Sequence, residues 1–316
     1  MAPFRARRSS EVALGWGGGL GYGGLGWAAV RESGGGPGRG PATVPAMTRI
    51  AVLGAGKIGE ALLSGLLASG RPASELVFTE RHAERAAELT ERLGIASADV
   101  AGAAAAADVV VVAVKPQDIA PVLGELKGAI RPGTLVVSLC AGLPTALFEG
   151  GLPDGTPVVR VMPNTPMLVG EAMSAVSPGA HATAEHVGTV VDMLAAVGRV
   201  VQVPESQQDA VTALSGSGPA YFFFLVEAMI DAGILLGLPR AVAADLIVQS
   251  AYGAASMMRE SDDHPVLLRE AVTSPAGTTI AAIRELERHG VRAALIAAIE
   301  AARDRSVELG RSVQAR

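Results

Sequence analysis

The sequence predicts an α/β fold, with an N-terminal Rossmann-type parallel sheet followed by an all-helical C-terminal dimerisation domain. From residue 48 to about 205, short apolar runs alternate with helical periodicity, which is typical of a parallel sheet wrapped by helices. After Pro204 the strand pattern stops and only helical segments follow. The predicted domains are therefore a dinucleotide-binding domain at 47–204 and a helical domain at 205–316.

Residues 1–46 differ from the rest of the chain. They are rich in glycine, contain both tryptophans and show no lasting periodicity. Such a segment buries too little apolar surface to offset the entropy of ordering, so we expect a disordered extension. Met47 directly precedes the first predicted strand and is a candidate for the true start of the protein.

The predicted elements follow from apolar patterning. The expected strands are 50–53, 76–79, 108–114, 135–139, 158–162, 171–176 and 200–203. The expected helices are the segment after the 50–53 strand, 82–93, 182–197, 206–215, 219–236, 239–259, 264–272 and 276–310, the last with a break at Gly290. Pro219 and Pro239 lie where helices begin, and Gly237 fits a helix C-terminal cap.

The first strand leads into a glycine-rich turn. Gly54, Gly56 and Gly59 have the G-x-G-x-x-G spacing between a predicted strand and a predicted helix. In this motif the first glycine permits the tight turn, the second lets a pyrophosphate approach the backbone, and the third lets the helix pack on the strand. The N–H groups at the helix start, around Lys57 and Ile58, then attract phosphate. The turn predicts dinucleotide binding.

Further cofactor contacts are expected where strands end, because ligands bind there in open α/β sheets. Glu80 stands where an acid can hydrogen-bond the adenosine ribose, whereas Arg81 could pair with a 2′-phosphate, so the choice between NADPH and NADH stays open. The other candidates are Val114, Lys115, Pro116, Ala141, Gly142 and Asn164. For Lys115 the alternative is a solvated lysine, and for Asn164 a local turn contact. Cys140 is interpreted as a packing residue.

A segment rich in hydroxyl groups leads into the helix expected at 276–310, just before the apolar periodicity of Ile280, Ile283 and Leu286. It contains Thr273, Ser274, Gly277, Thr278 and Thr279. The N–H groups of a helix start, together with several hydroxyls, make a site for a small carboxylate. A simple capped turn would need only one hydroxyl, so we interpret the loop as a ligand site.

Together these segments resemble pyrroline-5-carboxylate reductases over about residues 48–310. The resemblance rests on GAGKIGEAL, AVKPQD, CAG, VRVMPNTP, DAVTALSGSGPAY and AVTSPAGTTIAAIRELE, which stand in the family's order and spacing. It implies NAD(P)H-dependent reduction of Δ1-pyrroline-5-carboxylate to L-proline, the last step of proline biosynthesis. It also implies a cytoplasmic enzyme that forms homodimers through the helical domain, often assembled further into decamers.

The resemblance also assigns roles to single residues. It implies that Lys115 and Ala141 line the cofactor, and that Thr279 lies nearest the substrate nitrogen as the catalytic residue. The implied substrate-binding residues are Glu205, Ser274, Gly277, Thr278 and Thr279. The sequence departs from some members of the family at Asp99-Val100, Asp262, Ala271 and Ala276, so the adenosine contacts and the cofactor preference stay open.

Composition narrows the remaining classes of function. The net charge of −5 gives no reason to expect nucleic-acid binding, and a single cysteine permits no intrachain disulfide. We expect no membrane span, because Glu227 and Asp231 interrupt the most apolar helix, and no metal site, because no histidines are spaced as ligands. One rival is a β-hydroxyacid dehydrogenase, which would need a lysine that the helical region lacks. The other is a cofactor-binding scaffold, which would not need the hydroxyl-rich loop.

Overall fold

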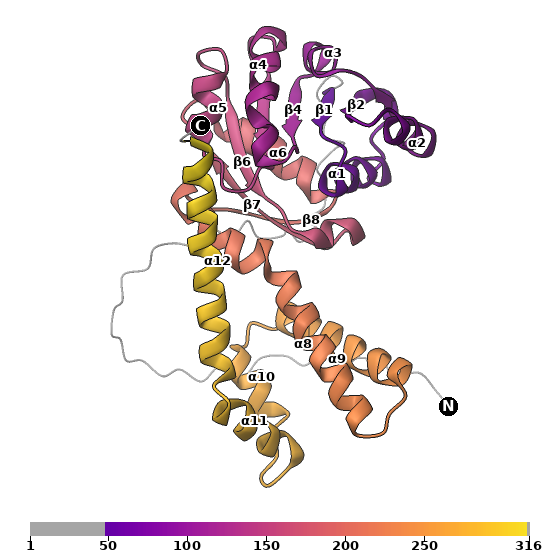
Figure 1. The fold of residues 1–316 in the computed structure, drawn as a ribbon, viewed down its shortest axis with the longest axis vertical. Helices are drawn as coiled ribbons and strands as arrows, with labels where there is room; N and C mark the ends of the chain where they lie inside the picture. Colours follow the sequence, from indigo (N-terminus) through magenta and orange to yellow (C-terminus); the bar gives the residue numbers. More distant parts are fainter. Residues whose placement is uncertain (1–47, 315–316) are drawn as a thin grey trace, which may run out of the picture. The chain divides into compact units, whose positions relative to one another are not determined.

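The computed structural model describes residues 48–314 (Figure 1). The expectation of a disordered extension at 1–46 lies outside the described residues, as does the question of whether Met47 is the true start. From residue 48, strands and helices alternate up to Gln202. Every described element after that point is helical, so the predicted fold class is confirmed.

A single sheet of eight strands forms the centre of the N-terminal part. The strands are β1 (Ile50–Leu53), β2 (Leu76–Thr79), β3 (Ala96–Ser97), β4 (Val109–Val112), β5 (Leu135–Ser138), β6 (Val158–Met162), β7 (Ala172–Pro178) and β8 (Gly198–Gln202). Their order in space is β3-β2-β1-β4-β5-β6-β7-β8. The chain therefore leaves β1 in one direction to β2 and returns on its other side to β4, which makes β1 the topological switch point where such sheets bind ligands.

One pairing departs from the parallel arrangement. β7 runs antiparallel to β6, and β8 is parallel to β7, whereas the other neighbours are parallel. The connection between β6 and β7 holds only the short 3₁₀ helix η3 (Thr165–Val169). A parallel crossover needs a dozen or more residues, so this short connection allows only an antiparallel return.

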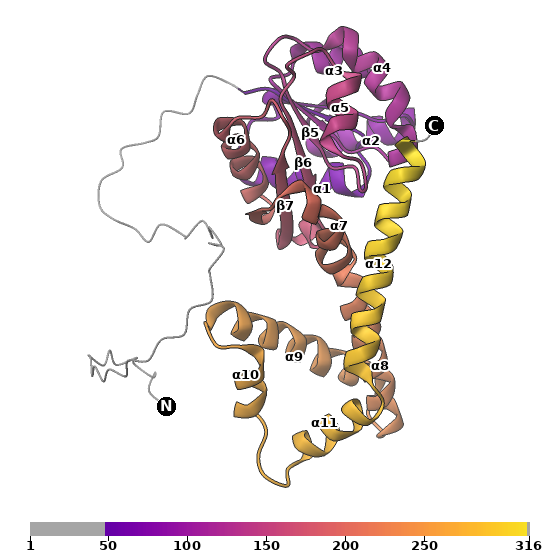
Figure 2. The same cartoon turned by 90° about the vertical axis from the view of Figure 1, so that its left-hand side faces the viewer.

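Six helices cover the sheet on its two faces (Figures 1 and 2). They are α1 (Lys57–Ala68), α2 (Ala83–Leu93), α3 (Val100–Ala106), α4 (Ile119–Ala129), α5 (Thr145–Gly151) and α6 (Ala184–Ala195). Side chains of α1, α2 and α6 pack in one apolar core, and those of α3, α4 and α5 in a second. β4 contributes Val109 and Val111 to the first core and Val110 and Val112 to the second, as expected for a strand buried on both faces.

The region after β8 is wholly helical. Its elements are η4 (Glu205–Gln207), α7 (Gln208–Val211), the π-helical turn η5 (Thr212–Gly216), α8 (Gly218–Leu235), α9 (Arg240–Glu260), α10 (Pro265–Ala271), α11 (Thr278–Arg288) and α12 (Val291–Gln314). The expected break in the last segment is confirmed, because Gly290 has a φ of 67° between α11 and α12. Gly237, with a φ of 92°, follows α8 and donates its N–H to the Ile234 carbonyl, as expected of a cap.

Much of the helical region is apolar and exposed. Three consecutive phenylalanines of α8, Phe222, Phe223 and Phe224, are 64–70% exposed. By length and composition alone, residues 205–235 would qualify as a membrane-spanning segment. The segment is not one regular helix, however, since a 3₁₀ turn, a short α-helix and a π-helical turn precede α8. An apolar surface of this size requires a partner to cover it.

Candidate functional site

The glycine turn follows β1 and opens α1, as the motif predicts. Gly54 has a φ of 96°, a conformation that a side chain would strain. Its N–H donates to the carbonyl and hydroxyl oxygens of Thr79 at 3.2 and 3.1 Å, so the turn is tied to the end of β2. Gly56 is the N-cap of α1 and has no side chain to occupy the N–H groups of the first helical turn. The helix N-terminus is therefore available to an anion.

The other two glycines of the motif make room in different ways. A Cβ on Gly56 would have no atom of the chain within 4 Å, so the space above this residue is open. A Cβ on Gly59 would lie 2.1 Å from the Gly54 carbonyl oxygen, so this glycine is required for the helix to pack on the turn. Open space at the second glycine and close packing at the third are what a bound pyrophosphate requires, and the residues present therefore fit a dinucleotide.

An ion pair lies beyond the end of β2, where the sequence predicts the adenosine contacts. Arg81 follows β2, and its guanidinium donates to both carboxylate oxygens of Asp118 at 3.3 and 3.2 Å. Asp118 lies in the 3₁₀ helix η2 (Pro116–Asp118) beyond β4, so the pair joins segments on either side of β1. Glu80 accepts a hydrogen bond from the N–H of His82 at 3.1 Å. The sequence identified Glu80 and Arg81 but not Asp118, whose pairing is visible only in three dimensions.

The remaining strand ends place their candidates along the same edge. Val114, Lys115 and Pro116 follow β4, and Lys115 is exposed as the N-cap of η2. Ala141 and Gly142 follow β5 in the loop that leads to α5; Ala141 is exposed and Gly142 has a φ of 75°. These positions agree with the expected cofactor contacts, which stay predictions.

Cys140 is a packing residue, as the sequence indicated. Its side chain is buried and its Sγ contacts the Val114 carbonyl oxygen at 3.3 Å. Burial raises the pKa of the Cys140 thiol to about 12. The thiolate that a nucleophile needs is therefore almost absent near neutral pH.

Asn164 uses its side chain within the chain. Its Nδ2 donates to the carbonyl and hydroxyl oxygens of Ser215 at 3.3 and 3.4 Å, and its Oδ1 accepts from the N–H of Met173 at 2.9 Å. The amide thus links the β6–β7 connection to the π-helical turn. The contact with Ser215 spans 51 residues and is not the local turn contact that was the alternative, and the predicted cofactor contact stays a prediction.

Glu205 likewise has partners that sequence reasoning did not foresee. One oxygen accepts from the N–H of Thr145 at 2.7 Å and lies 3.5 Å from Arg160, and the other accepts the Thr145 hydroxyl at 2.8 Å. Both carboxylate oxygens are therefore occupied at the junction of sheet and helices. These contacts give Glu205 a structural role, and the predicted substrate contact stays a prediction.

The hydroxyl-rich loop lies between α10 and α11, and Gly277 is the N-cap of α11. Ser274 and Thr278 are exposed and Thr279 is half-buried. Within residues 48–314, the hydroxyls of these three residues donate to no other group of the chain, whereas Thr273 donates to the Arg269 carbonyl at 2.6 Å. Three hydroxyls and an uncapped helix start are thus available to a ligand.

One left-handed residue and one close approach shape this loop. Ala276 has a φ of 57°, the one described residue other than glycine with a positive φ. A Cβ on Gly277 would lie 2.3 Å from the Ser274 hydroxyl, so a side chain there would displace Ser274. Strained backbone of this kind often accompanies ligand sites.

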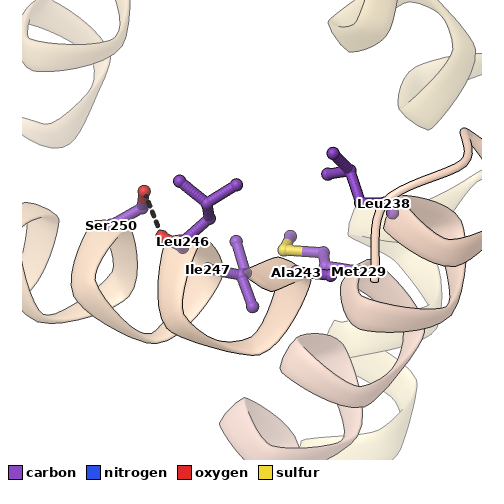
Figure 3. Close-up of a pocket in the computed structure, with 7 residues that line it drawn as sticks. Met229, Leu238, Ala243, Leu246, Ile247 and Ser250 are labelled. Carbon is purple, nitrogen blue, oxygen red and sulfur yellow. Dashed lines mark hydrogen bonds between the residues drawn. The ribbon is translucent and has the colours of Figure 1, made fainter. Parts of the chain in front are cut away.

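A hollow of about 170 Å³ lies between α8 and α9, and Figure 3 shows the side chains around it. The residues that line it are Met229, Gly233, Leu238, Ala243, Leu246, Ile247 and Ser250. It has no charged side chain to bind a carboxylate or a phosphate, so it is a poor candidate for the substrate site. A Cβ on Gly233 would approach the Ala243 Cβ to 2.8 Å, which shows how closely the two helices pack beside it. Among residues 48–314, no group of three metal-ligating side chains is present.

Two family models match the chain. Residues 205–309 match the pyrroline-5-carboxylate reductase dimerisation domain, which accounts for the exposed apolar helices and supports a homodimer. Residues 49–142 match the model described as NADP oxidoreductase coenzyme F420-dependent. The two matches fall on the helical region and on the first part of the sheet, respectively.

Individual relatives and solved structures agree with these matches. Pyrroline-5-carboxylate reductase of Corynebacterium melassecola is 51% identical over 269 residues, covering 84% of this chain and 100% of that protein. The Mycobacterium tuberculosis enzyme is 47% identical over 286 residues, covering 83% of this chain and 97% of its own. The structure of a pyrroline-5-carboxylate reductase from Coxiella burnetii has a TM-score of 0.79 at 36% identity, and the match covers 83% of this chain and 98% of that chain. The structure of the Plasmodium falciparum pyrroline carboxylate reductase, solved with NADP bound, has a TM-score of 0.76 at 28% identity. The match covers 83% of this chain and 98% of that chain. The chain belongs to the pyrroline-5-carboxylate reductase family.

Proposed function

We propose that this chain reduces Δ1-pyrroline-5-carboxylate to L-proline with a hydride from NADPH, the last step of proline biosynthesis, with NADH as an alternative cofactor. The observation that supports this most directly is the combination of two free anion-binding features. One is the open glycine turn at Gly56, and the other is the hydroxyl-rich loop at Ser274–Thr279. The first suits a dinucleotide and the second a small carboxylate, in a chain of this family.

Each feature has a defined task in the proposed reaction. NADPH, when bound, would supply a hydride to the carbon of the protonated imine, whose nitrogen keeps its proton and becomes the amine of proline. The N–H groups at the start of α1 hold its pyrophosphate, and Ala141 and Lys115 orient the nicotinamide end. Ser274, Thr278 and the N–H groups at the start of α11 hold the substrate carboxylate. The Thr279 hydroxyl holds the ring nitrogen, so that the imine carbon faces the cofactor. Orientation of this kind supplies most of what the chain must contribute.

The assembly that we propose is a cytoplasmic homodimer whose helical regions cover each other, with further association into a decamer. The loop at Ser274–Thr279 then serves the glycine turn of the partner subunit. The exposed phenylalanines of α8 and the match to a dimerisation domain support such pairing.

The experiment that tests the function follows oxidation of NADPH and of NADH at 340 nm with Δ1-pyrroline-5-carboxylate. We expect turnover with NADPH, and no oxidation with either cofactor would refute the proposal. Thr279→Ala should lower kcat/KM about 100-fold while the dissociation constant of NADPH stays unchanged. Thr189→Ala is a matched control, because this half-buried threonine of α6 donates only within its own helix, to the Glu185 carbonyl. Equal loss of turnover and cofactor binding in Thr279→Ala would contradict the assigned role.

A further inference from the structure

The loop Cys140–Thr145 connects β5 to α5. It carries Ala141, which is proposed to orient the nicotinamide, and Gly142, a further expected cofactor contact. Its first residue, Cys140, is buried, and its last, Thr145, begins α5. Between them Ala141 is exposed and Gly142 takes a left-handed conformation. Contacts on the side of the loop that faces away from the cofactor therefore also determine the position of Ala141 and Gly142.

Helix α12 contacts this loop backbone to backbone. A Cβ on Gly310 would lie 2.5 Å from the Gly142 carbonyl oxygen. A Cβ on Gly142 would lie 3.4 Å from the Gly310 nitrogen and 3.5 Å from the Ser306 carbonyl oxygen. Only glycine at 310 permits this approach without a shift of backbone. The last helix of the chain thus supports the middle of a loop more than 160 residues earlier.

A polar network holds the other end of the same loop. Ser306 of α12 donates to Asp209 at 2.7 Å, and Asp209 lies 4.0 Å from the guanidinium of Arg160. Arg160, which is buried in β6, also pairs with Glu205, and Glu205 binds the N–H and hydroxyl of Thr145. Removing one partner from a buried network leaves an uncompensated charge. The members of this network therefore keep their geometry together.

A hollow of about 170 Å³ lies among these residues. Gly142, Arg160, Asp209, Ser306 and Gly310 are part of its lining. The loop therefore has free volume on the side of these residues, while the Gly142–Gly310 contact holds it against α12. Loss of a contact would let the loop shift, whereas a fully packed loop would stay in place.

We propose that α12, through Ser306 and Gly310, positions the loop Cys140–Thr145 and thereby the nicotinamide, so that these two are positioning residues for hydride transfer. The inference rests on the proposed function. It predicts a separation of effects, because the pyrophosphate is held elsewhere, at the glycine turn after β1. Disturbing Ser306 or Gly310 should slow hydride transfer and leave cofactor binding intact.

The test measures the single-turnover rate of NADPH oxidation with full-length enzyme in excess and Δ1-pyrroline-5-carboxylate saturating, together with the NADPH dissociation constant. We expect Ser306→Ala and Gly310→Ala to slow the single-turnover rate at least about tenfold, with dissociation constants within about twofold of wild type. Ser312→Ala is the matched control, because this exposed serine of α12 donates only to the Leu309 carbonyl. It should behave as wild type.

The outcomes separate the two proposals. An inactive wild-type enzyme would refute the proposed function itself. An active wild type with unchanged single-turnover rates in Ser306→Ala would overturn the inference, even if the melting temperature falls, since a purely structural contact changes stability alone. Ser306→Ala removes only one hydroxyl and keeps the test valid should Gly310→Ala fail to fold.

Discussion

Replacing the second glycine of the turn should separate cofactor binding from folding. Gly56 has φ −68° and ψ −173°, a conformation that alanine adopts freely, and its Cβ would meet no atom of the chain within 4 Å. Gly56→Ala should therefore fold with a wild-type melting temperature. The added methyl group occupies the space through which the pyrophosphate reaches the backbone. We expect the NADPH dissociation constant to rise at least about tenfold, or about 1.4 kcal/mol.

The third glycine of the turn provides the contrasting variant. In Gly59→Ala the Cβ would lie 2.1 Å from the Gly54 carbonyl oxygen, so α1 must move away from the turn by about an ångström. Overpacking of this kind costs about 1–3 kcal/mol. In a chain of this size, each 1 kcal/mol lowers the melting temperature by about 2–4 °C. Gly59→Ala should thus lose both stability and cofactor binding.

The assay for this pair combines thermal denaturation with titration of NADPH fluorescence. The reasoning would be refuted by a Gly56→Ala variant that binds NADPH with the wild-type dissociation constant, because the cofactor would then not approach this backbone. It would also be refuted by a Gly59→Ala variant that melts at the wild-type temperature, because the contact with the Gly54 carbonyl oxygen would then not be limiting. A destabilised Gly56→Ala variant would show that the space above the turn is filled in the folded chain.

Three further predictions follow from other contacts of the site. Cys140 should not react with a thiol reagent at pH 8 in the native chain but should react fully in denaturant, since its pKa is raised to about 12. Deprotonation of the thiol favours the unfolded chain, so the contribution of Cys140 to stability should be lost as the pH rises from about 8.5 towards 12. The Cys140→Ala variant should not show this loss of stability. Asp118→Ala should lower the KM for NADPH severalfold and leave the KM for NADH unchanged, because Arg81 is freed for the 2′-phosphate; equal changes in both would contradict this. Gly56→Ala and Thr279→Ala subunits can be mixed 1:1 and refolded together. If each site combines the glycine turn of one subunit with the hydroxyls of the other, the mixture should recover about a quarter of wild-type activity. If each site lies within one subunit, it should recover almost none.

The glycine turn could be predicted because its evidence is local. Strand, turn and helix follow one another within about twenty residues, and the spacing of Gly54, Gly56 and Gly59 has a physical meaning without tertiary contacts. The uninterrupted apolar run at 108–114 likewise predicts a strand buried on both faces, and β4 occupies that place. The hydroxyls around Thr279 could be identified for the same reason, since they precede a helix that periodicity alone predicts.

The partners of charged side chains could not be predicted, because they come from distant parts of the sequence. Glu205 binds Thr145, which lies 60 residues earlier, and Arg160, which lies 45 residues earlier. One signal was present: Arg160 stands within the apolar run VVRVM, and an arginine in a buried strand requires an acidic partner. The apolar run does not identify which aspartate or glutamate pairs with Arg160, because the sequence contains many acidic residues. The sequence predicted β7 as a strand of a parallel sheet. Its antiparallel direction follows from the connection after β6, which is too short for a parallel crossover.

The apolar surface of the helical region bears on how the site is completed. Phe222, Phe223 and Phe224 point in different directions around α8, because consecutive helical residues are about 100° apart. A helix that is apolar all round must be enclosed, and burying about two-thirds of three phenylalanine side chains contributes on the order of 7 kcal/mol. A membrane would enclose it too, but it would also receive Glu227 and Asp231 from the same helix, which is costly. A second subunit can cover the rings and leave both carboxylates at the rim. The dimer that covers α8 is then also the assembly that can bring the hydroxyls around Thr279 to a partner's glycine turn, so that stability and substrate binding depend on the same association.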